Sequence, residues 1–337
     1  MKSTYVLVAL AVLIAAVLGY GAGHYTNSKS NPYQSITREG GYQYVNPLLS
    51  CDIAEDTEYI GFETLKSKLE STTRSMIATG KAKRISVYFR DMNYGAWTGV
   101  DADDTYIPAS LLKVPLMIAF FREFEQDPSL RNKEVFLPNG NDLNAEEYSK
   151  SQNHLALGQN YSVQNLIGAL IKGSDNNASA VLNQMVATSS LNEVYSQFAL
   201  PGITNDTSET MSPKSYMRAF RILYNASYIS RGSSQSALEL LSKTDFNSGI
   251  VAGVSAGTPV AHKFGERTVS AIDPVTKTSS LVKRELHDCG IVYYPRSPYG
   301  ICVMTEGSSF EDLEGVITAV SKIAYEAVQK GILSANQ

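Results

Sequence analysis

The stretch Ile107-Pro108-Ala109-Ser110-Leu111-Leu112-Lys113-Val114-Pro115 places a serine and a lysine three residues apart, just after a proline, at the head of an apolar run that continues to Phe121. Residues at positions i and i+3 of a helix lie on one face, so these two side chains meet if a helix begins here. Serine becomes a good nucleophile only when a neighbouring group takes its proton. The spacing therefore predicts a nucleophile, Ser110, with its base, Lys113, in the first turn of a buried helix.

Two further polar motifs follow this stretch. Ser174-Asp175-Asn176 comes directly after an apolar segment, residues 166–171, and Lys263-Phe264-Gly265 lies in residues 260–266, which read as the start of a strand. We expect Asp175 to brace its turn through backbone hydrogen bonds. A serine and a lysine at this spacing can also be a helix cap beside a solvated lysine. The two later motifs favour the catalytic interpretation.

In this order, the S-x-x-K, S-D-N and K-x-G motifs resemble those of the class A β-lactamases and the penicillin-binding D,D-peptidases. Lys113-Val114-Pro115 and Thr210-Met211-Ser212-Pro213 are similar to sequences of the same relatives, and the resemblance runs from about Lys83 to the C-terminus. It implies an α+β fold of the two-lobe serine β-lactamase/transpeptidase type. An antiparallel sheet built from both termini, flanked by helices, would carry an inserted all-helical lobe, and the motifs would converge where the lobes meet.

The resemblance also implies catalytic roles. Ser110 would attack a carbonyl and form an acyl-enzyme, while Lys113 takes its proton. Ser174 would relay a proton to the leaving group, and the strand of Lys263 would flank the scissile carbonyl. A free lysine is protonated at neutral pH, so burial and the Lys263 cation would have to lower the pKa of Lys113.

Three residues are expected to bind the substrate. The amide of Asn176 would hold Lys113 or the substrate. The backbone N–H groups of Glu266 and Ser110 would form an oxyanion hole, by the resemblance. Gly265 would leave room for a substrate lying along the strand.

Two departures from the family pattern limit the assignment. Phe264 stands where relatives carry threonine or serine, so a hydroxyl that would help to bind a substrate carboxylate is missing. No glutamate occurs in an E-x-x-L-N loop, because the acidic residues between Asn176 and Pro213 are Glu193, Asp206 and Glu209. The predicted reaction is therefore acyl transfer from β-lactams or a related amide, and penicillin-binding D,D-peptidase action with slow deacylation is the alternative.

The sequence admits two other interpretations. Residues 253–257 fit the G-x-S-x-G elbow of α/β-hydrolases, but a strand entry follows them where that elbow needs a helix. A penicillin-binding-like binding module without catalysis is the second. It has no physical need for the polar set Ser110, Lys113, Ser174 and Lys263, so catalysis is favoured.

The N-terminal segment, residues 5–23, carries no charged side chain and follows Lys2. Its length approaches the thickness of a bilayer, and a membrane anchor is favoured over a cleaved signal peptide. Residues 24–45 read as a linker and residues 46–337 as the catalytic domain. The domain would lie on the extracytoplasmic side of the cell membrane, or be secreted if the segment is cleaved.

Charge and composition exclude other partners. The 337-residue chain has a formal net charge of −4 and no basic stripe, so nucleic acid is not an expected partner. Its four histidines are dispersed without ligand spacing, so we expect no metal and no other cofactor. The expected partners are a small-molecule or peptidoglycan-derived substrate and the membrane, and the protein is expected to be a monomer.

Export would allow a disulfide among Cys51, Cys289 and Cys302. We expect Cys51 to pair with Cys289, with three buried thiols as the alternative, and we expect Cys289 and Cys302 in neighbouring strands. Apolar periodicity predicts helices at residues 57–80, 163–171, 177–186, 191–199, 213–225, 234–242 and 310–330, strands at 85–90, 96–100, 287–295, 299–306 and from 260, and few elements in 127–161.

Overall fold

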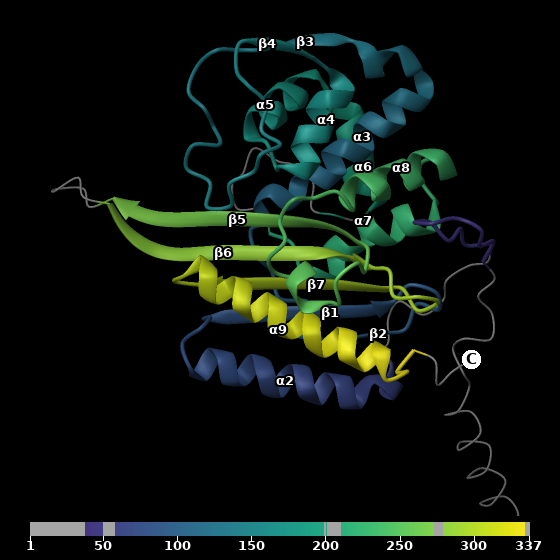
Figure 1. Ribbon diagram of the computed structural model, residues 1–337, viewed down its shortest axis with the longest axis vertical. Coiled ribbons are helices and arrows are strands. Elements are labelled where there is room, and N and C mark those ends of the chain that lie inside the picture. Colours follow the sequence, from purple (N-terminus) through teal and green to yellow (C-terminus); the bar gives the residue numbers. More distant parts are fainter. Residues whose placement is uncertain (1–37, 50–57, 199, 201–209, 273–278, 334–337) are drawn as a thin grey trace, which may run out of the picture. The chain divides into compact units, whose positions relative to one another are not determined.

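A five-stranded antiparallel sheet organises the computed structural model, which describes residues 38–49, 58–198, 200, 210–272 and 279–333 (Figure 1). The strand order is β2-β1-β7-β6-β5. Strands β1 and β2 precede the helical lobe in sequence and β5 to β7 follow it, so the sheet is built from both ends of the domain, as predicted. The strands are β1 (Arg84–Asp91), β2 (Trp97–Val100), β5 (Val260–Ile272), β6 (Ser279–Val292) and β7 (Tyr299–Gly307).

Helices α2 (Glu63–Ala78) and α9 (Phe310–Gln329) cover one face of this sheet (Figure 1). Helix α9 begins where the Ser309 side chain accepts the N–H of Asp312, which caps the helix. Its inward stripe is fully buried, and each leucine, valine or isoleucine side chain in it contributes about 2 kcal/mol by leaving water. The stripe comprises Leu313, Val316, Ile317, Val320 and Ala324.

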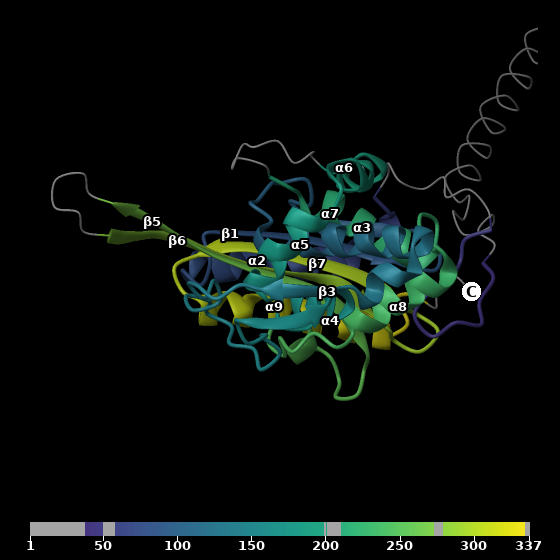
Figure 2. The same cartoon turned by 90° about the horizontal axis from the view of Figure 1, so that it is seen from above.

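The chain leaves the sheet after β2 and returns at β5, and the inserted segment forms the helical lobe on the other face (Figures 1 and 2). Within it, α3 is buried along most of its length, as its nearly continuous apolar sequence predicts. The predicted α+β architecture is confirmed. The lobe contains η3 (Ala109–Leu112), α3 (Lys113–Gln126), η4 (Pro128–Asn132), β3 (Glu134–Leu137), β4 (Gln159–Ser162), α4 (Val163–Lys172), α5 (Asn176–Met185), α6 (Thr188–Gln197), α7 (Pro213–Asn225) and α8 (Arg231–Leu241).

Two segments differ from the sequence prediction, and a third predicted segment lies outside the residues that the structure describes. No sequence signal marked the pair β3–β4, because each strand has four residues and only Leu137 among them is buried. Tyr44 and Val45, at the end of the predicted linker, are buried, and both of their N–H groups donate to Gln235. Residues 5–23 lie outside the described residues. No helix within the described ranges is long and apolar enough to cross a membrane.

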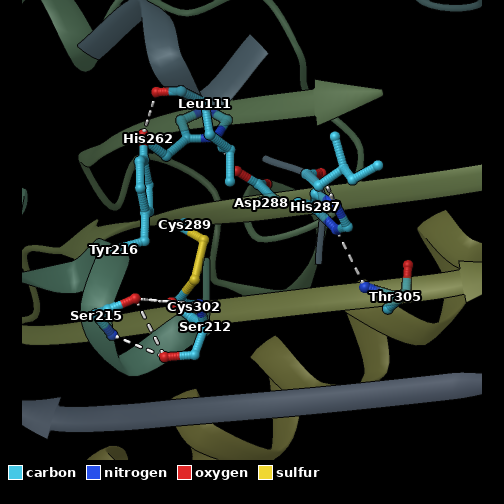
Figure 3. The surroundings of a disulfide bond; sticks show 11 residues. Leu111, Ser212, Ser215, Tyr216, His262, His287, Asp288, Cys289, Cys302 and Thr305 are labelled. Atoms are coloured by element: carbon cyan, nitrogen blue, oxygen red, sulfur yellow. Dashed lines mark hydrogen bonds and ion pairs between the residues drawn. A yellow bond between two sulfur atoms is a disulfide. The ribbon is translucent and has the colours of Figure 1, made fainter. Parts of the chain in front are cut away.

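A disulfide joins Cys289 of β6 to Cys302 of β7 (Figure 3). The predicted pairing of Cys289 with Cys51, which lies outside the described residues, is therefore wrong. The two strands pair antiparallel with Cys289 directly opposite Cys302, and their Cα atoms are 3.9 Å apart. The sequence placed these cysteines in neighbouring strands, but it did not fix the register that puts them side by side.

Candidate active site

Ser110 lies half-buried in the 3₁₀ turn η3, directly before α3 begins at Lys113. A 3₁₀ helix has three residues per turn, so positions i and i+3 lie on the same side of it. Ser110 and Lys113 therefore still share a face, as predicted. Ala109, just before the serine, has a φ of 49°, in the left-handed region. This conformation costs about 1 kcal/mol or more, so the surrounding structure must hold it.

Two side chains hold the nucleophile turn, defined here as residues 107–112. The hydroxyl of Tyr216, on α7, donates to the carbonyl of Leu111 at 2.9 Å (Figure 3). Nε2 of His287, on β6, lies 3.0 Å from the carbonyl of Ile107. Because a carbonyl can only accept, Nε2 carries the proton.

The neutral state of His287 follows from its other nitrogen. Nδ1 accepts the N–H of Thr305 at 3.2 Å, so it has no room for a second proton (Figure 3). Burial lowers the pKa of His287 to about 4. This support of the turn is therefore uncharged throughout the neutral range.

Gly265 packs beneath the nucleophile turn. A Cβ at this position would lie 2.7 Å from the carbonyl oxygen of Pro108 and 3.2 Å from the backbone nitrogen of Leu111. The glycine thus makes room for the turn that carries Ser110. The sequence interpretation, which reserved this space for substrate, did not foresee these contacts.

The Lys113 ammonium is buried and bound by the S-D-N motif. Its Nζ donates to Ser174 Oγ at 3.0 Å, to Asn176 Oδ1 at 2.7 Å, and to the carbonyl of Ser174. Burial lowers the pKa of Lys113 to about 8, although nearby carboxylates act in the opposite direction. At pH 7 about one molecule in ten would then carry the neutral amine, which is the form that can accept a proton.

The S-D-N turn is held in place by its own carboxylate. Ser174 is buried and has a φ of 58°, another left-handed residue at the site. Asp175 accepts the N–H of Ala178 at 2.9 Å, which caps α5, and the N–H of Leu155 at 2.8 Å. Asp175 therefore braces the turn through backbone hydrogen bonds, as predicted.

The Asn176 side chain is fully used within the protein. Its Oδ1 accepts from Lys113, and its Nδ2 donates to Glu147 Oε1 at 2.6 Å and to the carbonyl of Leu143 at 3.2 Å. The Lys113 ammonium can only donate, so the oxygen must face it. The amide was predicted to hold either Lys113 or the substrate, and these contacts support the first role.

Lys263 is fully buried in β5, and its Nζ donates to the carbonyl of Phe264 at 2.8 Å. Burial lowers its pKa well below the ordinary value, and repulsion from Lys113 adds to this. The Phe264 ring is buried and stacks on Phe246 with centroids 4.4 Å apart. The ring is therefore a core group.

Glu266 binds the backbone of the loop between β3 and β4. Its carboxylate accepts the N–H groups of Tyr148 at 2.6 Å and Ser149 at 3.0 Å. Strand β5 is at the edge of the sheet, so alternate N–H groups along it face away from β6. The oxyanion role of the Glu266 N–H stays a prediction.

A cavity of about 420 Å³ brings four predicted residues together, namely Ser110, Lys113, Asn176 and Glu266. Ser174 joins them through its hydrogen bond with Lys113. Lys263 and Gly265 lie on the same strand as Glu266 and do not line the cavity. A hollow of about 440 Å³ at the other end of α3 contains none of the predicted site residues, so volume alone does not identify a site.

Sequence reasoning missed Glu147, in the loop between β3 and β4. Burial raises its pKa to about 7, and the Lys113 cation opposes that rise. No motif marks this residue, because it lies in a polar stretch with few element signals. The only trace in the sequence is the acidic pair Glu146-Glu147.

Comparisons with known proteins identify the fold. The sequence model of the beta-lactamase enzyme family matches residues 68–328. An acyl-enzyme complex of a PBP-A mutant with penicillin G has a TM-score of 0.63 at 21% identity, over 80% of this chain and 97% of that chain. A beta-lactamase from Sphaerobacter thermophilus has a TM-score of 0.62 at 20% identity, over 77% and 96%. The TLA-1 extended-spectrum beta-lactamase has a TM-score of 0.62 at 19% identity, over 80% and 99%. A search of curated protein sequences finds no match.

Proposed function

Because the chain belongs to the beta-lactamase enzyme family, we propose that it is an active-site-serine hydrolase that forms an acyl-enzyme at Ser110 with β-lactams or a related amide. One observation carries the proposal. A buried lysine with a lowered pKa, Lys113, shares a cavity with Ser110 and is bound by Ser174 and Asn176. A non-catalytic binding module has no use for such a lysine.

In the proposed step, Ser110 Oγ bonds to the carbonyl carbon and its proton passes to the neutral amine of Lys113. The C–N bond of the amide then breaks, and the leaving nitrogen takes a proton from the Ser174 hydroxyl. Lys113, 3.0 Å from that hydroxyl, replaces this proton and is neutral again. The N–H groups of Ser110 and Glu266 would stabilise the oxyanion between these two events.

Deacylation is the weaker half of the proposal. Of the three acidic residues between the S-D-N motif and α7, Glu193 on α6 lies 3.8 Å from Arg122, and Asp206 and Glu209 lie outside the described residues. Glu193, the one of the three that lies within the described ranges, does not line the cavity beside Ser110. A penicillin-binding type of acyl transfer with slow deacylation is the second candidate, and the observation that favours it is that the sequence lacks the E-x-x-L-N motif between Asn176 and Pro213.

Export and membrane attachment complete the proposal. The uncharged segment 5–23 would anchor the chain, with the catalytic domain on the extracytoplasmic side. The disulfide Cys289–Cys302 suits an oxidising compartment of this kind. Peptidoglycan-derived amides are found there, and the protein would act on them as a monomer.

Intact mass spectrometry of the protein over time with penicillin G tests the assignment. A transient adduct with released product supports β-lactam hydrolysis, and a lasting adduct supports the penicillin-binding type. Ser110→Ala should abolish the adduct, whereas Ser179→Ala, which removes another hydroxyl from the same cavity, should keep it. Equal labelling of Ser110→Ala would refute the nucleophile. If penicillin G forms no adduct, a fluorophosphonate that also fails at Ser110 would refute the proposed reaction.

A further inference from the structure

A continuous chain of contacts joins Glu147 to the lysine of the site. Glu147 Oε1 accepts from Asn176 Nδ2 at 2.6 Å, and Asn176 Oδ1 accepts from Lys113 Nζ at 2.7 Å. The other oxygen, Oε2, is buried and has no hydrogen-bond partner within the described part of the chain. His154 Nε2 lies 3.2 Å from it but faces the carbonyl of Gly173 at 2.9 Å.

We propose that Glu147 is a positioning residue for acylation of Ser110: through the Asn176 amide it fixes the group that holds Lys113, and its negative charge helps to keep the proton on Lys113. This inference rests on the proposed function. Glu147 belongs to none of the three motifs, and it does not line the cavity beside Ser110. It therefore acts through Asn176 and Lys113, not on the substrate.

The Asn176 amide needs such a partner to keep its orientation. An amide presents an oxygen and a nitrogen of nearly equal size, and only the bonds it makes decide which one faces a neighbour. Leu143 and Glu147 both accept from Nδ2, so reversing the amide would turn NH₂ toward the Lys113 ammonium. The carboxylate thus fixes the acceptor that Lys113 requires.

Other charges face the same two groups. The carboxylates of Asp175 and Glu266 and the cation of Lys263 act on Glu147, and the two carboxylates also act on Lys113. The lysines Lys113 and Lys263 repel each other.

The other two carboxylates are already engaged with backbone N–H groups. Asp175 accepts from Leu155 and Ala178, and Glu266 accepts from Tyr148 and Ser149. Glu147, in contrast, is linked to the Lys113 ammonium through one side chain, that of Asn176.

The charge of Glu147 suits a lysine that must both take and return a proton. Burial alone favours the neutral amine of Lys113 and so weakens its hold on the proton that Ser174 needs next. A nearby carboxylate raises the pKa of Lys113, so the lysine keeps the proton taken from Ser110 long enough to return it to Ser174. The pKa of Glu147, raised to about 7 by burial, lies close to the value of about 8 for Lys113.

Glu147→Gln separates charge from shape, because glutamine keeps an oxygen acceptor for Asn176. The direct measurement is an NMR titration of the Lys113 ammonium in the full-length protein, assigned with Lys113→Met. We expect the Lys113 pKa to fall by about one unit or more in Glu147→Gln. The acidic limb of the pH profile for Ser110 labelling by a fluorophosphonate should move down by the same amount.

Glu146→Gln is the matched control. Glu146 precedes Glu147 in the chain and its side chain is exposed, so the variant removes the same charge without touching the Asn176 amide. It should leave both midpoints unchanged. Titrating Glu147 in Lys113→Met gives a reciprocal test that does not need the Glu147 variant, and its pKa should rise by the same amount.

Unchanged midpoints in Glu147→Gln, or an unchanged Glu147 titration in Lys113→Met, would overturn the inference. A shifted Lys113 titration without labelling of Ser110 in any protein would overturn the proposed function and leave the coupling of Glu147 to Lys113 standing.

Discussion

The close approach of β5 to the nucleophile turn makes Gly265→Ala a sharp test of how the site is built. The added Cβ would lie 2.7 Å from the Pro108 carbonyl oxygen, whereas ordinary contacts begin at 3.4 Å. The obstacle is backbone on both sides, so neither can turn away as a flexible side chain would. The backbone of Gly265 is not in the left-handed region, so the contact alone decides the outcome.

Relieving this contact must move the turn or the strand by several tenths of an ångström, and Ser110 moves with the turn. A displacement of about 1 Å at a reacting group costs roughly 100-fold in rate, so we expect the acylation rate to fall about 10- to 100-fold. The overpacked junction should also lower the free energy of unfolding by about 1–3 kcal/mol.

The acylation rate of Ser110 is read by mass spectrometry, and the free energy of unfolding by urea titration. Gly315→Ala is the matched control, because Gly315 is exposed on α9 and an added Cβ meets nothing within 4 Å. It should keep the wild-type rate and gain about 0.5–1 kcal/mol, since alanine favours the helix. Wild-type acylation and stability in Gly265→Ala would refute the reasoning.

Three further predictions concern stability. The pKa of His287 is lower in the folded than in the unfolded protein. Its contribution to the free energy of unfolding is therefore fully present above about pH 6.5, and about 3 kcal/mol is lost as the pH falls toward 4. Urea titrations of His287→Gln should show a flatter pH dependence than wild type, and an equal slope would contradict this. Replacing Cys289 and Cys302 with alanine should cost about 3 kcal/mol, because the bond closes a separation of 13 residues; an equal urea midpoint for oxidised and reduced wild type would contradict it. Phe264→Thr should cost about 3 kcal/mol or more without faster acylation, because the ring is buried against Phe246 and does not line the cavity. A faster acylation rate at unchanged stability would show that the missing hydroxyl was limiting.

The sequence predicted the fold and the centre of the site through the family resemblance of its three motifs, while local patterns marked the individual elements. Alternation marks β1 and β2, helical spacing marks α7 and α9, and the motif spacing places Ser110 beside Lys113. Each of these signals lies within about twenty residues, so it can be recognised without knowledge of the tertiary structure.

The missed features depend on register and on long-range packing. The partner of Cys289 is set by the alignment of β6 with β7, where a shift of one residue would separate the cysteines. Glu147 enters the site because Glu266 holds the adjacent backbone of Tyr148, a contact between residues more than 100 positions apart. Gly265 is required by the turn at Pro108, which no local pattern links to it.

The insertion of the helical lobe between β2 and β5 also has a consequence for folding kinetics. Strand β1 pairs with β7, where Ile85 lies opposite Thr305, about 220 residues later in the chain. Strands this far apart in the sequence pair slowly, because closing the long loop between them costs entropy before any stabilising contact forms. The strand that packs under Ser110 comes late in the chain as well, so we expect acylation competence to appear among the last events of folding, after the helices have formed.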